Sequence, residues 1–345
     1  MSGKGASIGT SAGKRGRMAI LMLTVLLATA FVLSFSLGRY GVPAVQVIRI
    51  LFRSLGLKKT WTDVMQTVVL NIRLPRIAMA CMVGCCLSAA GASYQGVFQN
   101  PMASPDILGA SNGAAFGAAL SILLGFSARM TSLWAFAVSM AAVLSVYFIA
   151  SRARGNKVVN LILAGIMVGS LFSAGTSYVK LVADPSNQLP QITYWLMGSL
   201  SGAKRSTVAW VIIPMTVGLT PLLALRWRIN LLTLGDDEAR TLGVNTDLLR
   251  LIVIVCSTLI TASSVAVSGM IGWVGLVIPH LCRKIVGSNY LYLLPASCIG
   301  GALFLLLVDD ISRNLMAVEI PIGILTAFVG APFFIYLLCR KEKTL

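Results

Sequence analysis

Long apolar runs separated by short basic loops dominate the amino-acid sequence. A helix that crosses a bilayer needs about 20 consecutive apolar residues. Runs of about that length lie near residues 18–37, 74–94, 106–125, 131–150, 158–182, 207–226, 248–268, 289–308 and 320–339. A shorter element from Gly272 to Val286 contains Pro279 and ends in basic residues. The pattern predicts about ten membrane-spanning helices.

Backbone polar groups cannot stay unpaired in lipid, so apolar segments of this length must form helices. Of the 345 residues, 57% are hydrophobic and 11% are charged, and the mean hydropathy is +0.86. A soluble domain needs far more charge to cover its surface. We therefore expect an all-α polytopic membrane protein in a lipid bilayer, with residues 18–345 as a single transmembrane domain.

Small residues recur at every fourth position in two of the runs. They are Gly109, Gly113 and Gly117 in one run, and Gly165, Gly169 and Ser173 in another. Such stripes let helix backbones approach closely in a membrane. We interpret them as packing surfaces and make no claim of a binding site.

Basic residues mark the loops and the N-terminal segment. Residues 1–17 carry four Lys and Arg residues, and the apolar run that follows is too long for the core of a cleaved signal peptide. We expect a disordered, basic cytoplasmic tail followed by a retained first helix. With this orientation the inner loops hold the larger share of the Lys and Arg residues, in line with the positive-inside rule. Both termini are then cytoplasmic.

The net charge of +17 is spread over these loops and is not collected on one polar domain, so we predict no nucleic-acid partner. The segment from Gly9 to Arg15 is a weak match to a phosphate loop. Its spacing is one residue short, and Arg15 stands where a hydroxyl is needed. If ATP drives transport, the ATPase must be another chain.

Ionisable groups for other kinds of transport or for catalysis are scarce in the apolar runs. All 11 acidic residues lie at the ends of predicted spans or in loops, whereas ion-coupled carriers usually keep such a group at mid-membrane. The single histidine, His280, lacks neighbouring ligands, and the seven cysteines lack a metal-binding spacing. We predict no metal site, no cofactor and no enzymatic activity, and we interpret the cysteines as packing residues.

The segment from Leu234 to Val244 reads LGDDEARTLGV and differs from the other loops. Three consecutive acids favour the start of a helix, and Gly243 is suited to the left-handed turn that ends one. A short amphipathic helix at the membrane surface can fit a groove on a soluble partner and transmit a rigid-body movement. The alternative interpretation is a solvated, charged loop.

Further short motifs follow one another along the chain. They are RLPR at 73–76, QGVFQNPMASP at 95–105, LG at 108–109, NGA at 112–114, YWLMGS at 194–199, GWVGLVIPHLCR at 272–283, EIPIG at 319–323 and GAPFF at 330–334. Together with LGDDEARTLGV, and in this order, they resemble the FecCD family of permeases for ferric siderophores, haem and cobalamin. The resemblance covers the chain from about Arg73 to Leu338.

The resemblance implies the permease fold of type II ABC importers. Two such ten-helix subunits, as a homodimer or a heterodimer, enclose the translocation path. Two ABC ATPase subunits are expected to dock on the cytoplasmic side, and a substrate-binding protein on the other side. ATP hydrolysis then belongs to a partner and not to this chain.

The resemblance also implies roles for three sets of residues. Coupling to the ATPase falls on the loop near 230–246, at Asp236, Asp237, Glu238, Ala239, Arg240, Leu242 and Gly243. Docking of the binding protein falls on Arg73, Arg76 and Arg313, whose alternative roles are interfacial anchors or partners for nearby acids. The cytoplasmic gate falls on Gln99, Asn100, Pro101 and Met102, for which a plain helix-connecting turn is the alternative.

The resulting hypothesis is an importer permease for an iron chelate, with a ferric siderophore preferred because such permeases are frequent in the family. Haem and cobalamin remain as alternative cargoes, because the sequence shows no readable substrate pocket. A different class of protein, an ion-coupled secondary transporter or a channel, would work without an ATPase.

Overall fold

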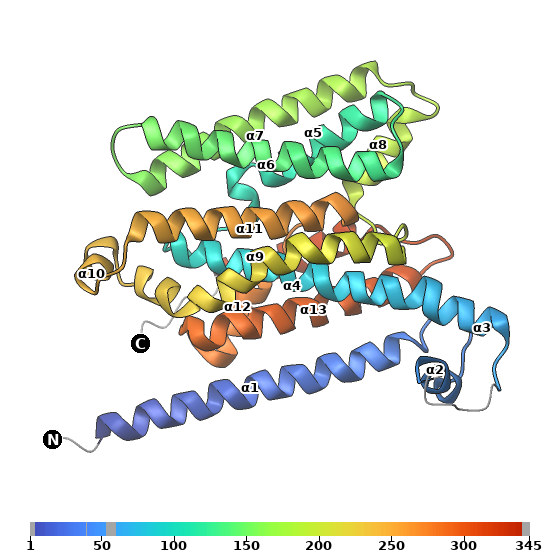
Figure 1. Cartoon of the computed structure of the whole chain (residues 1–345), viewed down its shortest axis with the longest axis horizontal. Coiled ribbons are helices and arrows are strands. Elements are labelled where there is room, and N and C mark those ends of the chain that lie inside the picture. The colour runs from blue at the N-terminus through green and yellow to red at the C-terminus, as the bar shows by residue number, and fades with distance from the viewer. Residues whose placement is uncertain (1–3, 39, 53–59, 340–345) are drawn as a thin grey trace.

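The computed structural model describes residues 4–38, 40–52 and 60–339, and every regular element in these ranges is a helix (Figure 1). The elements are α1 (Lys4–Ser34), α2 (Ala44–Leu51), α3 (Asp63–Thr67), η2 (Val68–Arg73), α4 (Leu74–Val97), η3 (Pro105–Leu108), α5 (Ala110–Leu123), α6 (Ala128–Arg152), α7 (Lys157–Val182), α8 (Gln188–Met197), α9 (Arg205–Leu232), α10 (Asp236–Thr241), α11 (Thr246–Ser268), α12 (Val274–Val286), α13 (Tyr290–Asn314) and α14 (Ile322–Cys339). The long helices run roughly side by side along the longest axis.

Each predicted span contains one of these helices. In the described part of the chain, seven helical segments are long and apolar enough to cross a membrane, and α4 counts among them together with α3 and η2 as Asp63–Val97. The shorter helices α5, α12 and α14 occupy the remaining predicted positions. The predictions of an all-α fold and of about ten spans are confirmed for the described residues.

Three features of the helix pattern differ from the predictions. Helix α1 begins at Lys4, so the basic segment that we expected to be a disordered tail forms the first turns of this helix. Extending an existing helix is far easier than nucleating a new one, which accounts for the difference. Helices α2 and α8 were not predicted, because both are too short to give a clear apolar run.

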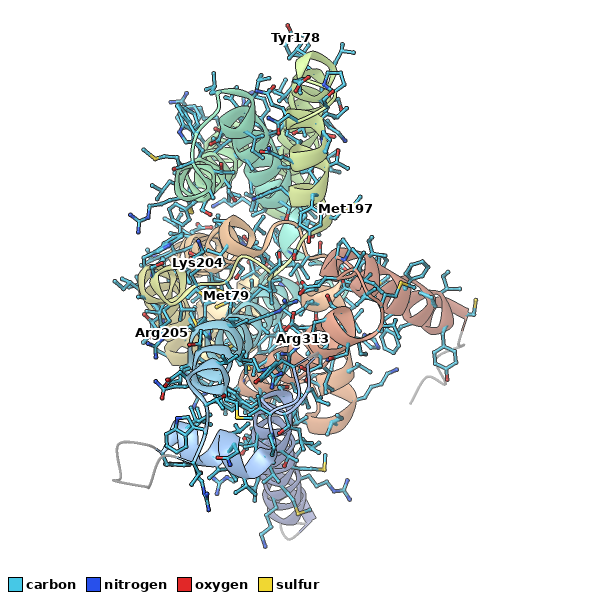
Figure 2. The ribbon with its side chains drawn as sticks, turned by 90° about the vertical axis from the view of Figure 1, so that its right-hand side faces the viewer. Met79, Tyr178, Met197, Lys204, Arg205 and Arg313 are labelled. Carbon is cyan, nitrogen blue, oxygen red and sulfur yellow. The ribbon has the colours of Figure 1, made fainter. Side chains whose placement is uncertain are left out.

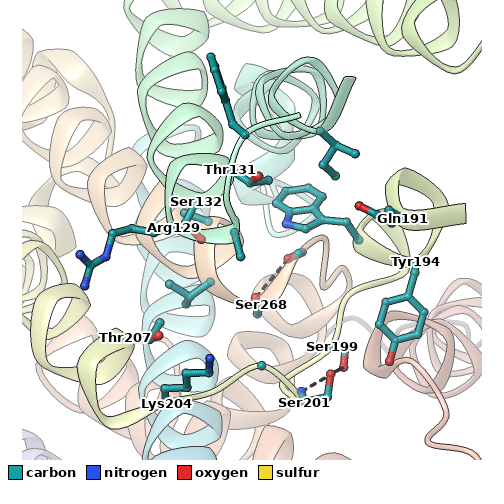
Figure 3. Close-up of a pocket in the computed structure, with 18 of the residues that line it drawn as sticks. Arg129, Thr131, Ser132, Gln191, Tyr194, Ser199, Ser201, Lys204, Thr207 and Ser268 are labelled. Atoms are coloured by element: carbon teal, nitrogen blue, oxygen red, sulfur yellow. Dashed lines mark hydrogen bonds between the residues drawn. The ribbon is translucent and has the colours of Figure 1, made fainter. Parts of the chain in front are cut away.

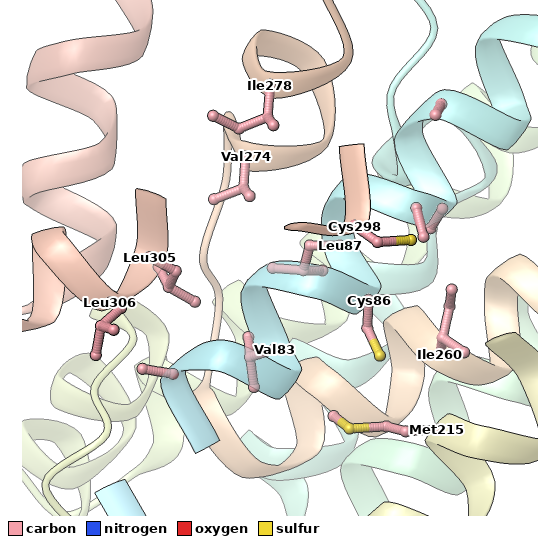
Figure 4. Close-up of a cluster of buried hydrophobic side chains, with 14 of the residues drawn as sticks. Val83, Cys86, Leu87, Met215, Ile260, Val274, Ile278, Cys298, Leu305 and Leu306 are labelled. Carbon is pink, nitrogen blue, oxygen red and sulfur yellow. The ribbon is translucent and has the colours of Figure 1, made fainter. Parts of the chain in front are cut away.

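Helix α4 lies at the centre of the molecule and packs against α9, α11, α12 and α13. Its closest approaches are at glycines. A Cβ atom on Gly84 would lie 2.2 Å from the carbonyl oxygen of Gly301 in α13, and one on Gly91 would lie 1.8 Å from that of Gly275 in α12. Apolar side chains fill the space around these contacts, among them Val83 of α4 (Figure 4).

Helices α5 to α8 form a separate group along one side of this core (Figure 1). The glycines of the small-residue stripes are confirmed here as packing positions, whereas Ser173, the last residue of the second stripe, is exposed. A Cβ atom on Gly117 of α5 would lie 2.5 Å from the carbonyl oxygen of Trp134 in α6, and one on Gly165 of α7 would lie 2.1 Å from that of Ile107 in η3. The opposite face of α7 is largely exposed and apolar.

The two ends of the bundle carry different features. Helix α10 lies at one end, which we call the α10 end, and α2 and α3 lie at the other, the α2 end (Figure 1). Figure 2 looks onto the α2 end, where Lys204, Arg205 and Arg313 lie. The residues expected to couple to an ATPase and those expected to dock a binding protein therefore lie at opposite ends of the molecule.

Candidate functional site

The predicted short helix is present as α10, with a glycine on each side. Gly235 precedes it with φ +129° and Gly243 follows it with φ +80°, values that favour glycine. Ala239 is fully buried and anchors the helix to the bundle, while Leu242 is 59% exposed. The helix thus presents an apolar side chain and charged side chains at the surface of the α10 end.

The acids of α10 are not equivalent. Asp236 accepts hydrogen bonds from the buried guanidinium of Arg250 in α11, at 2.9 and 3.0 Å, so it fixes the helix to the bundle. Asp237 and Glu238 are exposed. Arg240 lies against the start of α11, where its Nε donates to Thr246 at 3.2 Å. Asp237 and Glu238 are therefore the acids of α10 that a partner can reach.

An apolar groove of about 340 Å³ lies beside α10, between the end of α9 and the start of α11. Leu231, Leu242, Val244 and Leu248 contribute to its lining. The groove could not be predicted from the sequence, because its walls come from three separate elements. The only signal in the sequence was Leu242, which stands among polar residues.

The expected gate residues form a tight turn after α4. Gln99 has a positive φ of +49°, and the Asn100 side chain accepts a hydrogen bond from the Met102 backbone at 2.9 Å. The Gln99 side chain donates to the carbonyl oxygen of Leu232 at 2.8 Å, at the last residue of α9. All four residues of the turn, Pro101 included, are exposed at the surface. The structure therefore joins the Gln99–Met102 turn to the segment that leads into α10.

The three arginines expected to dock a binding protein come together at the α2 end, but their side chains are buried. Arg76 donates to Asp309 at 3.0 and 3.1 Å and to Glu319 at 2.8 and 3.0 Å. Arg313 donates to Asp310 and, at 3.1 Å, to the carbonyl oxygen of Ser34.

Arg73 donates to the carbonyl oxygens of Phe35 and Tyr40, in the segment between α1 and α2. Arg73, Arg76 and Arg313 are only 4 to 7% exposed. In this subunit on its own, the three guanidinium groups bind acids and carbonyl groups of their own chain. Their expected role in docking a binding protein stays a prediction.

A second cavity, of about 590 Å³, opens where the starts of α6 and α9 approach α8 and the end of α11. Figure 3 shows Lys204 and Thr207 on one side of it, and Gln191 and Tyr194 on the other. Hydroxyl, amide and basic side chains line the cavity together with apolar and aromatic ones such as Trp210, and its described lining contains no acidic residue. The cavity could not be predicted from the sequence, because one of its walls is α8, a helix that the apolar pattern does not reveal.

Comparisons with known proteins agree with this geometry. The chain matches the FecCD transport family over residues 26–340. It is 40% identical to the molybdate import system permease protein MolB of Haemophilus influenzae, over 93% of this chain and 95% of that protein. It is 37% identical to the hemin transport system permease protein HmuU of Yersinia pestis, over 94% of this chain and 96% of that protein.

A probable iron chelatin transport system permease of Helicobacter pylori is 40% identical, over 80% of this chain and 83% of that protein. A solved structure, described as an inward-facing metal-chelate type ABC transporter, superposes with a TM-score of 0.83 at 38% identity, over 92% of this chain and 98% of that one. Permeases of this family work with separate ATPase and substrate-binding partners. The chain belongs to the FecCD transport family and is a membrane-embedded permease subunit of an ABC importer.

Proposed function

We propose that this permease imports an iron chelate, with a ferric siderophore as the preferred cargo, across the inner membrane of a prokaryote. Two copies of the chain, or this chain and a related one, would enclose the path, with two ATPase subunits at the α10 end and a binding protein at the α2 end. Both termini then face the cytoplasm. The observation that carries the proposal is the surface helix α10 at one end of a bundle that matches an importer family over residues 26–340.

The choice of an iron chelate is supported by the names of similar proteins. Relatives named for hemin, iron chelatin and Fe³⁺-citrate are 37 to 40% identical to this chain. Molybdate and cobalamin are the other cargoes named among the relatives, at 40% identity each. Haem, cobalamin and molybdate are therefore the competitors that a test of the cargo must include.

At the α10 end, we assign ATPase coupling to α10 with its exposed Asp237, Glu238 and Leu242. Ala239 is packed into the bundle and Asp236 is bonded to Arg250, so a force on the surface of α10 reaches the bundle without a flexible linker. The Gln99–Met102 turn, bonded to the end of α9, serves as the gate next to it. This arrangement suits a rigid-body coupling mechanism.

At the α2 end, docking of the binding protein is the role we assign to the arginine cluster. The side chain of Glu319 is 32% exposed, whereas Asp309 is fully buried, so Glu319 is the counter-ion of Arg76 that solvent can reach. A carboxylate of a docked protein can take the place of Glu319 on Arg76, because guanidinium groups bind carboxylates in one plane with two donors. Arg73 and Arg313 hold the backbone around this point.

The rival class, an ion-coupled secondary transporter or a channel, finds less support. Asp309 lies inside α13 but is paired with Arg76 at 3.0 Å, as expected of a structural ion pair. A carboxylate that carries ions must instead be free to bind and release them.

The test uses the tagged chain purified from its native membranes with the subunits that accompany it. We expect an ABC ATPase to copurify, and the complex in sealed proteoliposomes, with its binding protein, to take up a ⁵⁵Fe-labelled siderophore only when ATP is supplied. Unlabelled ferric siderophore should compete for uptake, and haem, cobalamin and molybdate should not. Uptake that proceeds without the ATPase would overturn the proposal of an ATP-driven importer. Competition by molybdate alone would overturn the proposal that the cargo is a ferric siderophore.

A further inference from the structure

The last turn of α9 leads into α10 and is fastened to two other helices. The Gln99 side-chain amide, just after α4, donates to the Leu232 carbonyl oxygen at 2.8 Å. The Asn230 side-chain oxygen accepts a hydrogen bond from the backbone N–H of Tyr290, the first residue of α13, at 3.1 Å. Ile229 and Leu232 are fully buried, so this turn sits firmly in the bundle.

Tyr290 completes the connection between the three helices. Its hydroxyl donates to the carbonyl oxygen of Ala92 in α4 at 3.1 Å. Gly96 leaves room for this contact, since a Cβ atom there would lie 2.7 Å from Cγ2 of Ile229 and 3.0 Å from Cζ of Tyr290. Three helix termini are therefore closely packed against one another here, namely the ends of α4 and α9 and the start of α13.

The link from α9 to α10 is also short and hydrogen-bonded. The backbone N–H of Gly235 donates to the Leu232 carbonyl oxygen at 3.3 Å, and Leu234 donates to Leu231 at 3.1 Å. The Leu232 carbonyl thus accepts bonds from both Gly235, which begins the coupling segment, and Gln99, which begins the gate turn. One peptide group joins the two elements.

The Gln99–Met102 turn is shaped by these contacts. Gln99 adopts a left-handed conformation that residues other than glycine rarely take. Such a conformation persists where its surroundings determine it. Here the Leu232 carbonyl holds its side chain, and the Asn100 backbone N–H donates to the Gln95 carbonyl oxygen at 3.2 Å.

We propose that Gln99, Asn230 and Tyr290 are positioning residues that make the Gln99–Met102 turn and α10 move as one body when the ATPase acts. This inference rests on the proposed function, because it takes α10 as the ATPase contact. Movement of α10 then opens or closes the gate turn directly, through the clamp formed by α4, α9 and α13.

The first experiment measures cargo taken up per ATP hydrolysed by the reconstituted complex. We expect Gln99→Ala, Asn230→Ala and Tyr290→Phe each to lower this ratio about fivefold, the factor that corresponds to loss of one hydrogen bond. Assembly with the ATPase should persist, because none of the three side chains belongs to the exposed part of α10.

Two matched controls remove similar bonds elsewhere. Asn289 accepts from the Leu291 N–H at 2.9 Å, so Asn289→Ala weakens the start of α13 but leaves the bond that the Tyr290 N–H donates to Asn230. Gln188 donates to the Leu123 carbonyl oxygen at 3.0 Å, so Gln188→Ala removes a Gln–carbonyl bond far from α10. Both controls should keep the wild-type ratio. Equal ratios in Asn230→Ala and Asn289→Ala would overturn the inference, provided that the wild-type complex couples.

The second experiment measures a distance in the assembled complex. Spin labels are attached at Leu242→Cys and Met102→Cys, which are exposed positions, in a Cys339→Ser background. We expect the distance between the labels to stay the same with and without ATP. When Asn230→Ala is added, the distribution of distances between the labels should become broader. A distance that changes with ATP in the starting background would overturn the inference. A wild-type complex that hydrolyses ATP without uptake would instead overturn the proposed function.

Discussion

Arg76 illustrates how a single buried cation stabilises the α2 end. It connects α4 to α13 through Asp309, and to the segment before α14 through Glu319. Asp309 has no exposed surface, and its other basic neighbour, Arg313, lies farther away at 3.7 Å. A buried carboxylate that loses its main counter-ion is strongly destabilising, whereas the intact pair is close to neutral.

From this arrangement we predict that Arg76→Met lowers the free energy of unfolding by about 3 kcal/mol, because Asp309 is left buried with a distant partner. The double variant Arg76→Met/Asp309→Asn should regain most of the loss, because no unpaired charge remains. Equilibrium unfolding in mixed SDS and detergent micelles measures both values. The exposed Arg205 at the same end gives the control Arg205→Met, for which we expect little change.

A double variant as unstable as Arg76→Met would contradict the charge-pair explanation and leave side-chain packing as the cause.

The Arg76 variant also tests docking of the binding protein. If Arg76 binds a carboxylate of the binding protein in place of Glu319, then Glu319→Gln should strengthen docking, while Arg76→Met should weaken it even where the protein stays folded.

The family resemblance singled out three arginines that lie together at this end, but the sequence could not predict their partners within the chain. Arg76 and Asp309 are 233 positions apart, and only tertiary packing of α4 on α13 brings them together. The same holds for Gln99 and Leu232, which are 133 positions apart. Local patterns carry no information about such pairs, so the burial of the predicted docking residues had to come from the structure.

At the scale of elements, the length of apolar runs predicted the spanning helices well and the short helices poorly. Helix α10 was the exception, because its acids, its glycine and its place between two spans gave three independent signals. Helix α8 mixes Gln, Pro and Thr with aromatic residues over only 10 positions, so it gave no clear period. The cavity beside α8 was missed for the same reason.

Helix packing around α4 gives a prediction at this scale. We expect Gly91→Ala to destabilise the bundle by about 2 kcal/mol or more, because its Cβ atom would lie 1.8 Å from the Gly275 carbonyl oxygen and would force α4 and α12 apart. Gly202→Ala is the control, since nothing lies within 4 Å of a Cβ atom there. The unfolding temperature of purified Gly91→Ala should be clearly lower than that of Gly202→Ala. Equal temperatures would mean that α12 moves away from α4 without loss of stability.

At the scale of the whole molecule, the two sets of candidate functional residues lie at opposite ends of the bundle, one helix length apart. The α10 end carries a surface helix that is linked through the end of α9 to the Gln99–Met102 turn, and the α2 end carries a neutral cluster of three arginines and three acids. Between them, the helical segment Asp63–Val97 connects the two ends through the core, and 78% of the residues in its most apolar stretch are buried. A rigid central helix of this kind suits a protein that receives work at one end and cargo at the other.

This separation predicts the orientation in the membrane. In sealed right-side-out vesicles, a membrane-impermeant maleimide should label Lys204→Cys, at the α2 end, and should spare Leu242→Cys, beside α10, in a Cys339→Ser background. Permeabilising the vesicles should make Leu242→Cys reactive, because its side chain is 59% exposed. This orientation is expected because basic residues are in excess at the α10 end, and the positive-inside rule places such an end in the cytoplasm. The reverse labelling pattern would place α10 outside the cell, where no ATP-driven subunit could reach it, and coupling through this helix would be impossible.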